Sequence, residues 1–379
     1  MSRRGSRRTG AVEDLWRRAP GRPHHHPYGR AGGPGRLAFT TMNALGASIG
    51  PDGPWPPVSV VMPVLNEENH LRESVERILA NGYPGEVEIA LAVGPSHDRT
   101  EEIAAELEAR HAEVLVVHNP TGRTPAALNA AIRATTHPVV VRVDGHGMLP
   151  PGYIRTAVRE LVRTGAANVG GQMVPQGVTP LEQAVARAMS SYLGIGGAEF
   201  HVGGVAGPVP SVYLGVFRRD VLERLGGFDE EFHRAQDWEL NYRIRQAGEQ
   251  VWFVPELRVT YRPRSTFRAL ARQFHGSGQW RREVMTRYRE TASVRYLAPP
   301  AALVGVVGGA LVAGAGLATG TAWARAAAVL PAGYAGVVLL GSLVEGRGLP
   351  LRARLRFPAV IACMHMSWAW GFLRPGGRR

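Results

Sequence analysis

The sequence predicts an α/β protein whose mainly parallel sheet, covered by helices on both faces, is followed by C-terminal membrane helices. Short apolar segments alternate with amphipathic segments between residues 58 and 143, which is typical of β-α-β units in a parallel sheet. Farther on, residues 299–324 carry no charge, and a run of this length exceeds the roughly 20 apolar residues that span a bilayer. The single cysteine, Cys363, excludes an intramolecular disulfide and a multi-cysteine zinc site.

The charge of the chain is strongly basic. Its 379 residues carry a formal net charge of +13, and every basic residue other than histidine is an arginine. Guanidinium groups pair with polyanions, so nucleic acid, anionic lipid and a phosphate-bearing substrate all fit this balance. The arginines gather near the N-terminus and beside the apolar C-terminal segments. This distribution favours a membrane as partner and no nucleic acid.

Residues 1–56 form a basic tail rich in Arg, Gly and Pro, without a sustained apolar period. We expect this tail to be disordered. Its cluster His24–His26 is a weak metal candidate, because no partner ligands accompany it. No apolar segment follows the first arginines, which argues against a secretory signal, and Met42 is an alternative first residue.

The strands and helices follow in order from Val58. The apolar run Val58–Val64 predicts a buried strand, and apolar residues at helical spacing follow it from Leu71 to Leu79. The same unit recurs, with strands expected at 87–93, 114–117 and 139–143 and helices at 99–111 and 126–134. Ligands bind at the carboxyl ends of such strands, so the loops at Asn66, Ser96 and Asp144 should open on one edge.

Two segments carry residues suited to chemistry. Asp144 and His146 directly follow the strand at 139–143, and a carboxylate with an imidazole can ligate a divalent cation that bridges a diphosphate. An acid at a strand end also commonly forms a turn. Asp237 opens a second predicted helix, where it is either an N-terminal cap or a general base aimed into a cleft.

From about Val58 to Pro300 the chain resembles the family 2 inverting glycosyltransferases with the GT-A fold. The motifs that carry the resemblance occur in the family's order: Pro63 with Asn66 and Glu67, Ser96 with Asp98 and Thr100, Ala127-Leu128-Asn129, Asp144-Gly145-His146, Gly226-Gly227-Phe228-Asp229, and Gln236-Asp237. Four further segments are similar to the exopolysaccharide branch typified by succinoglycan glucosyltransferases: 213–215, 236–241, 261–264 and 278–281.

The resemblance implies transfer of a hexose from a nucleotide sugar, a UDP-hexose in the first instance, to a lipid-linked sugar or polysaccharide. It implies Asp237 as the catalytic base, and Asp144 and His146 as ligands of Mn²⁺ or Mg²⁺. Partner proteins of an envelope-glycan pathway are compatible with it. The implied donor-binding residues are Pro63, Asn66, Glu67, Ser96, Asp98, Arg123, Asn129 and Asp144. The implied acceptor residues are Asp229, Gln236, Gln273 and Trp280.

The chain departs from the family pattern at two points. Val93 and Gly94 stand where the family has an acidic pair that meets the nucleotide base. His146 replaces the second acid of the metal motif, a change also found in the exopolysaccharide branch. An imidazole suits Mn²⁺ better than Mg²⁺.

Several of these residues have a structural alternative. Asp98 with Glu101 matches a capping box for the next helix, and Asn66 matches an N-cap with Glu67 in the first turn. Arg123 fits a solvated loop charge as well as a nucleotide contact. Trp280 fits core packing as well as an acceptor site.

The segment 263–297 connects the predicted catalytic domain, 57–262, to the membrane region, 298–379. Within it, apolar residues share one helical face: Phe267, Leu270, Ala271 and Phe274. A basic amphipathic helix at this position predicts binding in the headgroup layer. Arginines precede the first apolar segment and follow the second, while only Arg325 lies between them. By the positive-inside rule the catalytic domain is cytoplasmic, on a multi-pass protein of the cell membrane.

A third apolar segment, 357–373, is followed by Arg374, Arg378 and Arg379. Their charge does not fit three full crossings, so we interpret this segment as re-entrant or interfacial and expect two to three hydrophobic helices.

Two rival functions stay open from the sequence. A nucleotidyltransferase on a similar sheet would need a Gly-rich phosphate loop with a lysine, and the chain has no lysine. A non-catalytic membrane or nucleic-acid binding protein would use the arginines alone.

Overall fold

The computed structural model describes residues 54–232 and 234–374. The chain divides into two compact units, 1–41 and 42–379, and every described residue belongs to the second. The expectations for the tail, including His24–His26, therefore lie outside the described residues, except at 54–56.

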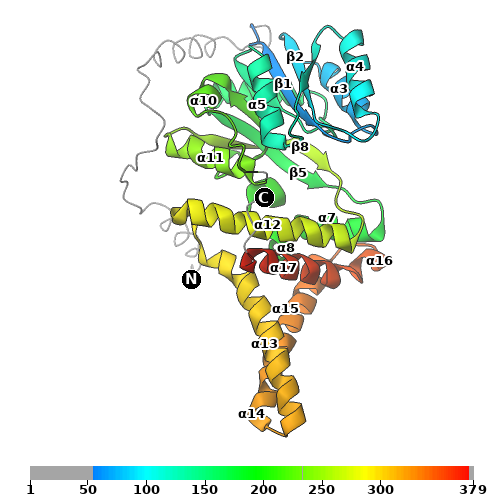
Figure 1. Ribbon diagram of the computed structural model, residues 1–379, viewed down its shortest axis with the longest axis vertical. Helices are drawn as coiled ribbons and strands as arrows, with labels where there is room; N and C mark the ends of the chain where they lie inside the picture. The colour runs from blue at the N-terminus through cyan, green and yellow to red at the C-terminus, as the bar shows by residue number, and fades with distance from the viewer. Residues whose placement is uncertain (1–53, 233, 375–379) are drawn as a thin grey trace, which may run out of the picture. The chain divides into compact units, whose positions relative to one another are not determined.

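One eight-stranded sheet organises the described part of the chain (Figure 1). Its order is β3-β2-β1-β4-β7-β5-β8-β6. The first four strands pair in parallel, and β7 joins them antiparallel to β4. The mainly parallel sheet expected from the sequence is thereby confirmed. The strands are β1 (Val58–Val64), β2 (Val87–Val93), β3 (Val114–His118), β4 (Val139–Arg142), β5 (Asn168–Pro175), β6 (Gly207–Pro208), β7 (Tyr213–Arg218) and β8 (Val251–Tyr261).

Helices cover both faces of the sheet. One face packs against α3 (Leu71–Leu79), α4 (Thr100–Arg110) and α6 (Tyr153–Thr164). The other packs against α5 (Thr124–Ala134), α10 (Arg219–Arg224) and α11 (Gln236–Gln246). Side chains of β1 alternate between the two cores, since Val60 and Met62 join the first and Val61 the second. Burial on both faces explains why this strand is continuously apolar.

A third apolar core joins the sheet domain to the C-terminal helices. It combines residues of α7 (Pro180–Met189), α12 (Phe267–Arg287), α15 (Val329–Glu345) and α17 (Phe357–Leu373). Leu270 and Phe274 of α12 are buried in it, whereas Phe267 is 39 % exposed. The apolar face of α12, expected to contact lipid headgroups, is therefore covered largely by α17. The described residues also form short helices: α8 (Tyr192–Ile195), α9 (Glu199–Val202), α14 (Ala322–Arg325), α16 (Leu351–Arg354), η1 (Arg289–Thr291), η2 (Val294–Leu297) and η3 (Ala326–Ala328).

Two helical segments are long and apolar enough to cross a membrane. They are Val294–Thr319, which contains α13 (Ala298–Thr319), and Ala322–Glu345, which contains α15. The two helices pack against each other and run away from the sheet (Figure 1). The third apolar segment differs from them, because α17 has 17 residues and buries Val360, Met364 and Phe372 against its neighbours. Its short length and its packing on α12 explain why charges can follow it.

Two glycines allow α12 and α17 to lie side by side at very short range (Figure 1). A Cβ atom added to Gly278 would lie 2.0 Å from the carbonyl oxygen of Trp368. A Cβ atom added to Gly371 would lie 2.0 Å from the carbonyl oxygen of His275. Both neighbours are backbone atoms, so neither contact can relax by rotation of a side chain.

We therefore predict that Gly278→Ala destabilises the protein by about 3 kcal/mol or more, at the upper end of the cost of overpacking. Thermal unfolding of the detergent-purified chain measures this loss. Gly308→Ala in α13 is the matched control, because no atom lies within 4 Å of the added Cβ. Equal unfolding midpoints for the two variants would contradict the close helix contact.

Candidate active site

The loops after β1 and β2 are joined by hydrogen bonds. The Asn66 amide donates to Ser96 Oγ at 3.1 Å, and the His97 amide donates to Asn66 Oδ1 at 2.8 Å. The Glu67 amide donates to the Thr100 hydroxyl at 2.7 Å. These contacts confirm that the two loops meet at one edge of the sheet. Asn66 is not an N-cap, because α3 begins at Leu71. The Asn66 side chain accepts from the His97 amide instead.

Asp98 belongs to the same junction. Its carboxylate accepts from the amide of Glu68 across the loop at 3.2 Å and from both the amide and the hydroxyl of Thr100. The hydroxyl of Thr100, followed by these amides, lowers the pKa of Asp98. The expected capping box with Glu101 is wrong, because α4 has Arg99 at its N-cap and the Glu101 carboxylate accepts from the Ser96 amide.

The loop after β4 reaches the same edge. His146 Nδ1 lies 2.7 Å from Glu67 Oε1. Gly145 packs so closely on Glu67 that an added Cβ would lie 2.9 Å from its Cγ. The hydrogen bond to Glu67, reinforced by the charge of nearby Asp144, raises the pKa of His146. All three loops expected to meet are thus in contact.

Arg142, the last residue of β4, binds both acids that the sequence singled out. Its Nη2 lies 2.9 Å from Asp144 Oδ1, and its Nη1 is paired with Asp237 Oδ1. The exposed fraction is 6 % for the Arg142 side chain, 20 % for Asp144 and 38 % for Asp237. A nearly buried cation therefore holds the two carboxylates at one point. The sequence analysis did not identify Arg142, although a charged residue in a strand buried on both faces needs a partner.

Tyr213, at the start of β7, lies near this ion triad. Burial, and to a smaller extent the negative charge of Asp144, raises the pKa of Tyr213 well above its usual value. The phenol therefore stays protonated. It is a second polar group of the site that sequence reasoning did not assign.

Asp237 and Glu239 differ sharply in environment. Asp237 lies in the first turn of α11, whose N-cap, Ala235, makes no side-chain capping bond, so Asp237 is not explained as a cap. Glu239 is fully buried, where it accepts from Arg243 and from the Tyr288 hydroxyl, both at 2.7 Å. Only Asp237 of these two acids faces Arg142 and solvent.

Three non-glycine residues with positive φ lie in segments next to the three loops and the ion triad. Within residues 54–232 and 234–374, the non-glycine residues with positive φ are Asn66 at 55°, Leu214 at 44° and Ala235 at 59°. Asn66 lies in the β1 loop, Leu214 follows Tyr213, and Ala235 precedes the helix that carries Asp237. Strained backbone of this kind persists where the surrounding structure over-determines it, and it clusters at functional sites.

The residues expected to bind an acceptor lie at three places: Asp229 precedes α11, Gln236 is on α11, and Gln273 and Trp280 are on α12. Asp229 pairs with Arg287 at 2.9 Å. Trp280 packs on Phe232 with ring centroids 5.8 Å apart. Gln273 donates to the Tyr261 hydroxyl at 3.3 Å and accepts from Arg264. Gln236 is partly exposed at the first position of α11.

Three expected donor residues have different surroundings. Asn129 is 7 % exposed and forms hydrogen bonds with both backbone groups of Phe228 and with Glu230. These bonds hold the turn before Asp229, which is a structural role for Asn129, and its contact with the donor stays a prediction. Arg123 is exposed at the start of α5, and the carbonyl of Pro63 lies against Gly145.

The donor set at the β4 loop fits one class of metal. Among the residues that the structure describes, no group of three or more His, Cys, Asp or Glu side chains forms a complete cage. Mg²⁺ and Mn²⁺ need no such cage, because they bind through one or two protein ligands plus phosphate oxygens and water. Asp144 Oδ2, which is outside the bond to Arg142, and the half-exposed imidazole of His146 meet that requirement.

Comparison with known proteins identifies the family. The family model described as "Glycosyltransferase like family 2" matches residues 56–275, more than half of the chain. The chain belongs to glycosyltransferase family 2. It is therefore a glycosyltransferase, and this decides against the nucleotidyltransferase and the non-catalytic binding protein.

Relatives of the chain agree with this family. It is 29 % identical over 320 residues to the succinoglycan biosynthesis protein ExoA of Rhizobium meliloti, covering 83 % of this chain and 93 % of ExoA. It is 27 % identical over 280 residues to the pre-mycofactocin glycosyltransferase of Mycobacterium tuberculosis, covering 72 % of this chain and 55 % of that protein.

A solved structure shares the fold. The mannosyltransferase PcManGT of Pyrobaculum calidifontis, in complex with GDP-Man and Mn²⁺, matches with a TM-score of 0.53 and 19 % identity. The match covers 88 % of this chain and 94 % of that one. The fold of this family 2 enzyme is thus the expected GT-A fold.

We predict that Arg142→Met destabilises the protein by about 1–3 kcal/mol, less than the cost of breaking a fully buried pair because Asp237 is partly solvated. The variant leaves two carboxylates without the cation between them. Adding Asp237→Asn to it should recover part of the loss, since one of the two charges is removed. Denaturant unfolding of both single variants and the double variant measures this coupling, and strictly additive losses would contradict the ion triad.

Proposed function

We propose that the protein transfers a hexose, with inversion, from a nucleotide diphosphate sugar to a lipid-linked or polysaccharide acceptor at the cytoplasmic face of the membrane. The observation that carries this proposal is the ion triad. Asp144, on the expected donor side, and Asp237, on the expected acceptor side, contact the same guanidinium. One sugar bound over Arg142 can therefore reach both carboxylates.

The donor site is proposed at the junction of the three loops. Asn66, Glu67, Ser96 and Asp98 form the wall of this junction, with Arg123 available from the next loop for a phosphate. Asp144 and His146 would hold Mn²⁺ or Mg²⁺, which when bound offsets the negative charge of the leaving diphosphate. The proposed donor is a UDP-hexose.

The chemical step is a single displacement. Asp237 accepts the proton of the acceptor hydroxyl while that oxygen forms a bond to the anomeric carbon of the donor. The bond between the anomeric carbon and the diphosphate breaks at the same time, and its electron pair leaves with the nucleoside diphosphate. Arg142 keeps Asp237 oriented toward the sugar. Attack from the side opposite to the leaving group inverts the anomeric centre.

Membrane placement is part of the proposal. The segments containing α13 and α15 are the proposed spans, and α17, which follows them, packs on α12, which precedes them. This contact supports two crossings with both flanking parts on one side. The single arginine between the spans, Arg325, and the several arginines outside them support a cytoplasmic catalytic domain.

The acceptor is proposed to enter between α11 and α12. Asp229, Gln236, Gln273 and Trp280 are the residues we propose for it. The similarity to a succinoglycan biosynthesis protein over most of both chains supports a role in exopolysaccharide synthesis. Transfer from a panel of labelled nucleotide sugars to extractable lipid or polymer, in membranes that carry the protein, tests the whole proposal. Absence of transfer from every donor would overturn it.

We predict that Asp237→Asn lowers turnover by on the order of 10² to 10⁴, because it removes the base while preserving the side-chain shape. Donor affinity should stay nearly unchanged. Steady-state transfer and nucleotide-sugar binding are the two measurements. Glu239→Gln is the control, and its main effect should be lower stability through loss of the bonds to Arg243 and Tyr288. The roles must be exchanged if Glu239→Gln abolishes transfer in a stable protein while Asp237→Asn retains it.

Asp144→Ala should abolish the gain in nucleotide-sugar affinity that Mn²⁺ produces, because it removes the carboxylate ligand. His146→Ala should reduce that gain less, since it leaves the carboxylate in place. Titration calorimetry with and without Mn²⁺ measures both effects. Wild-type dependence on Mn²⁺ in the Asp144 variant would show that the metal binds elsewhere.

A further inference from the structure

Arg264 follows β8 at the edge of the sheet that carries the candidate active site. Met148, in the loop after β4, pairs with Thr260 of β8 in an antiparallel bridge. Because the pairing is antiparallel, the residues that follow Thr260 lie toward the residues that precede Met148. The chain therefore brings Arg264 to the side of the loop that carries Asp144 and His146.

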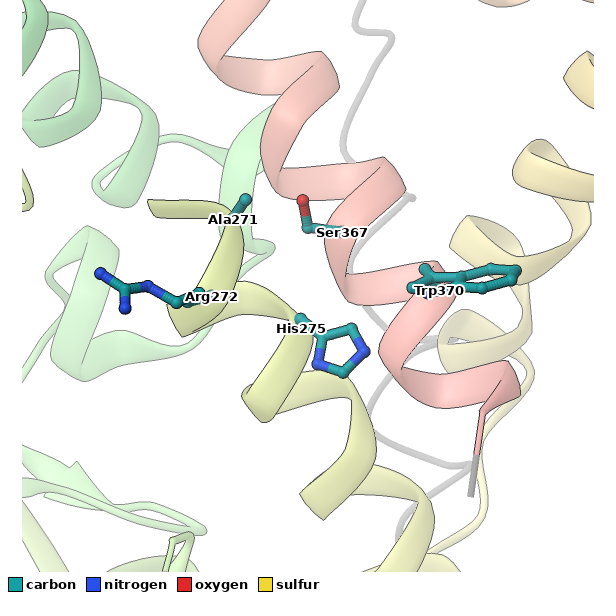
Figure 2. Close-up of a pocket in the computed structure, with 5 residues that line it drawn as sticks. All are labelled: Ala271, Arg272, His275, Ser367 and Trp370. Atoms are coloured by element: carbon teal, nitrogen blue, oxygen red, sulfur yellow. The ribbon is translucent and has the colours of Figure 1, made fainter. Parts of the chain in front are cut away.

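A side chain of α12 orients the Arg264 guanidinium. The Arg264 Nε donates to Gln273 Oε1 at 3.1 Å, and Gln273 Nε2 donates to the Tyr261 hydroxyl at 3.3 Å. Ala271 and His275 line a hollow between α12 and α17 (Figure 2). At 3.6 residues per turn, a residue midway between two that are four apart lies on the opposite face of the helix. Gln273 therefore faces away from α17, toward the end of β8.

The two terminal nitrogens of Arg264 are free to bind a ligand. Its side chain is exposed, and among the described residues its one hydrogen bond is that of Nε to Gln273, with no acid in an ion pair. Arg142 differs, because both carboxylates of the ion triad occupy its guanidinium. A guanidinium held at Nε presents its two remaining nitrogens as a fork, which matches two oxygens of a phosphate.

The charge at this edge favours an anion that arrives with extra cations. The Glu67 and Asp144 carboxylates belong to the three loops, and the charge of Arg142 is shared between two acids. A diphosphate brought here adds negative charge, which cations without an acid must offset. The hydrogen bond from Glu67 raises the pKa of His146, and the positive charge of Arg264 opposes this rise. Arg264 is therefore within electrostatic reach of the imidazole proposed as a metal ligand.

The start of α12 adds to the positive potential. Arg264 precedes the N-cap residue, Thr266, by two positions, and the first turn of α12 contains no acid. A cation at the positive end of a helix dipole is unfavourable unless an anion neutralises it. This position thus favours an anion beside Arg264.

We propose that Arg264 binds the diphosphate of the nucleotide sugar and that Gln273 positions it for this contact. Asp144 and His146 would hold the metal from the β4 loop, while Arg264 reaches the same diphosphate from the end of β8. The negative charge that develops on the leaving nucleoside diphosphate is then offset by a permanent cation of the protein. Gln273 keeps a second amide hydrogen for the acceptor. The inference rests on the proposed function and deepens it, since it assigns a residue to the leaving group.

Titration calorimetry of the detergent-purified full chain with Mn²⁺ tests the assignment. UDP, GDP and ADP are the probes, and the one that binds wild-type protein most tightly is used for the variants. Arg264→Gln should weaken its binding about tenfold, as expected for loss of a charge-assisted hydrogen bond. Gln273→Leu should weaken it about threefold, as for a neutral hydrogen bond. The double variant should bind no more weakly than Arg264→Gln alone, because Gln273 acts through Arg264.

Arg262→Gln is the matched control. Arg262 is an exposed arginine two residues earlier. The pKa of Glu182 in α7 is lowered by hydrogen bonds from Thr179 and, to a smaller extent, by the charge of Arg262. The charge of Arg262 therefore acts on another part of the protein, and its loss should leave diphosphate affinity unchanged.

Four outcomes would contradict the inference. Equal losses for Arg262→Gln and Arg264→Gln would replace the site by diffuse surface charge, and additive losses in the double variant would remove the positioning role of Gln273. Unchanged diphosphate affinity in Arg264→Gln, with a raised KM for a lipid-linked acceptor in the transfer assay, would assign Arg264 to an acceptor phosphate. Wild-type protein that binds none of the diphosphates would overturn the proposed function as well. Binding that Arg264→Gln leaves unchanged would overturn this inference alone.

Discussion

The candidate site depends on one ion triad, in which the guanidinium of Arg142 binds Asp144 and Asp237. These acids come from different parts of the chain, one after β4 and one at the start of α11. Without a cation between them, two carboxylates this close would repel each other in a partly desolvated cleft. The strand that carries Arg142 is buried on both faces, so its end holds the guanidinium in a fixed place. The sheet thus supplies the positive charge of the site and fixes its position.

A second network holds α11 against the helices that lead to the proposed spans. Glu239 is anchored by Arg243 and Tyr288. Arg281 of α12 lies between two aromatic rings, 4.9 Å from the Trp238 centroid and 4.6 Å from that of Tyr296. Trp238 is the neighbour of Asp237, and Tyr296 closely precedes α13. Arg281 therefore connects α11, which carries the proposed base, to the segment that precedes the proposed membrane region.

The helical layer under the sheet domain has its own steric constraint. Gly278 and Gly371 let α12 and α17 approach until backbone atoms of one helix occupy the space of a side chain on the other. This close contact covers much of the apolar face of α12 with protein, while Arg268 and Arg272 of the same helix are exposed. Leu270 and Phe274 of α12 are buried in this layer, whereas Phe267 and Trp370 remain partly exposed. The packing of the two helices thereby removes part of their apolar area from water.

The sequence by itself determined the alternating strands and helices, the edge at which Asn66, Ser96 and Asp144 meet, and the two long apolar segments, because periodicity, strand direction and uninterrupted hydrophobicity are local properties. Only the tertiary structure decided which polar groups form hydrogen bonds with residues distant in the chain. The side-chain amide of Asn129 is hydrogen-bonded to the turn at Phe228, and the Glu239 carboxylate is buried beside the Tyr288 hydroxyl. The Asp98 carboxylate accepts from the Glu68 amide. The role of Arg142 also follows only from the tertiary structure, since its two carboxylate partners lie 2 and 95 residues away. A side chain's role depends on partners distant in the chain, and local patterns carry no information about them.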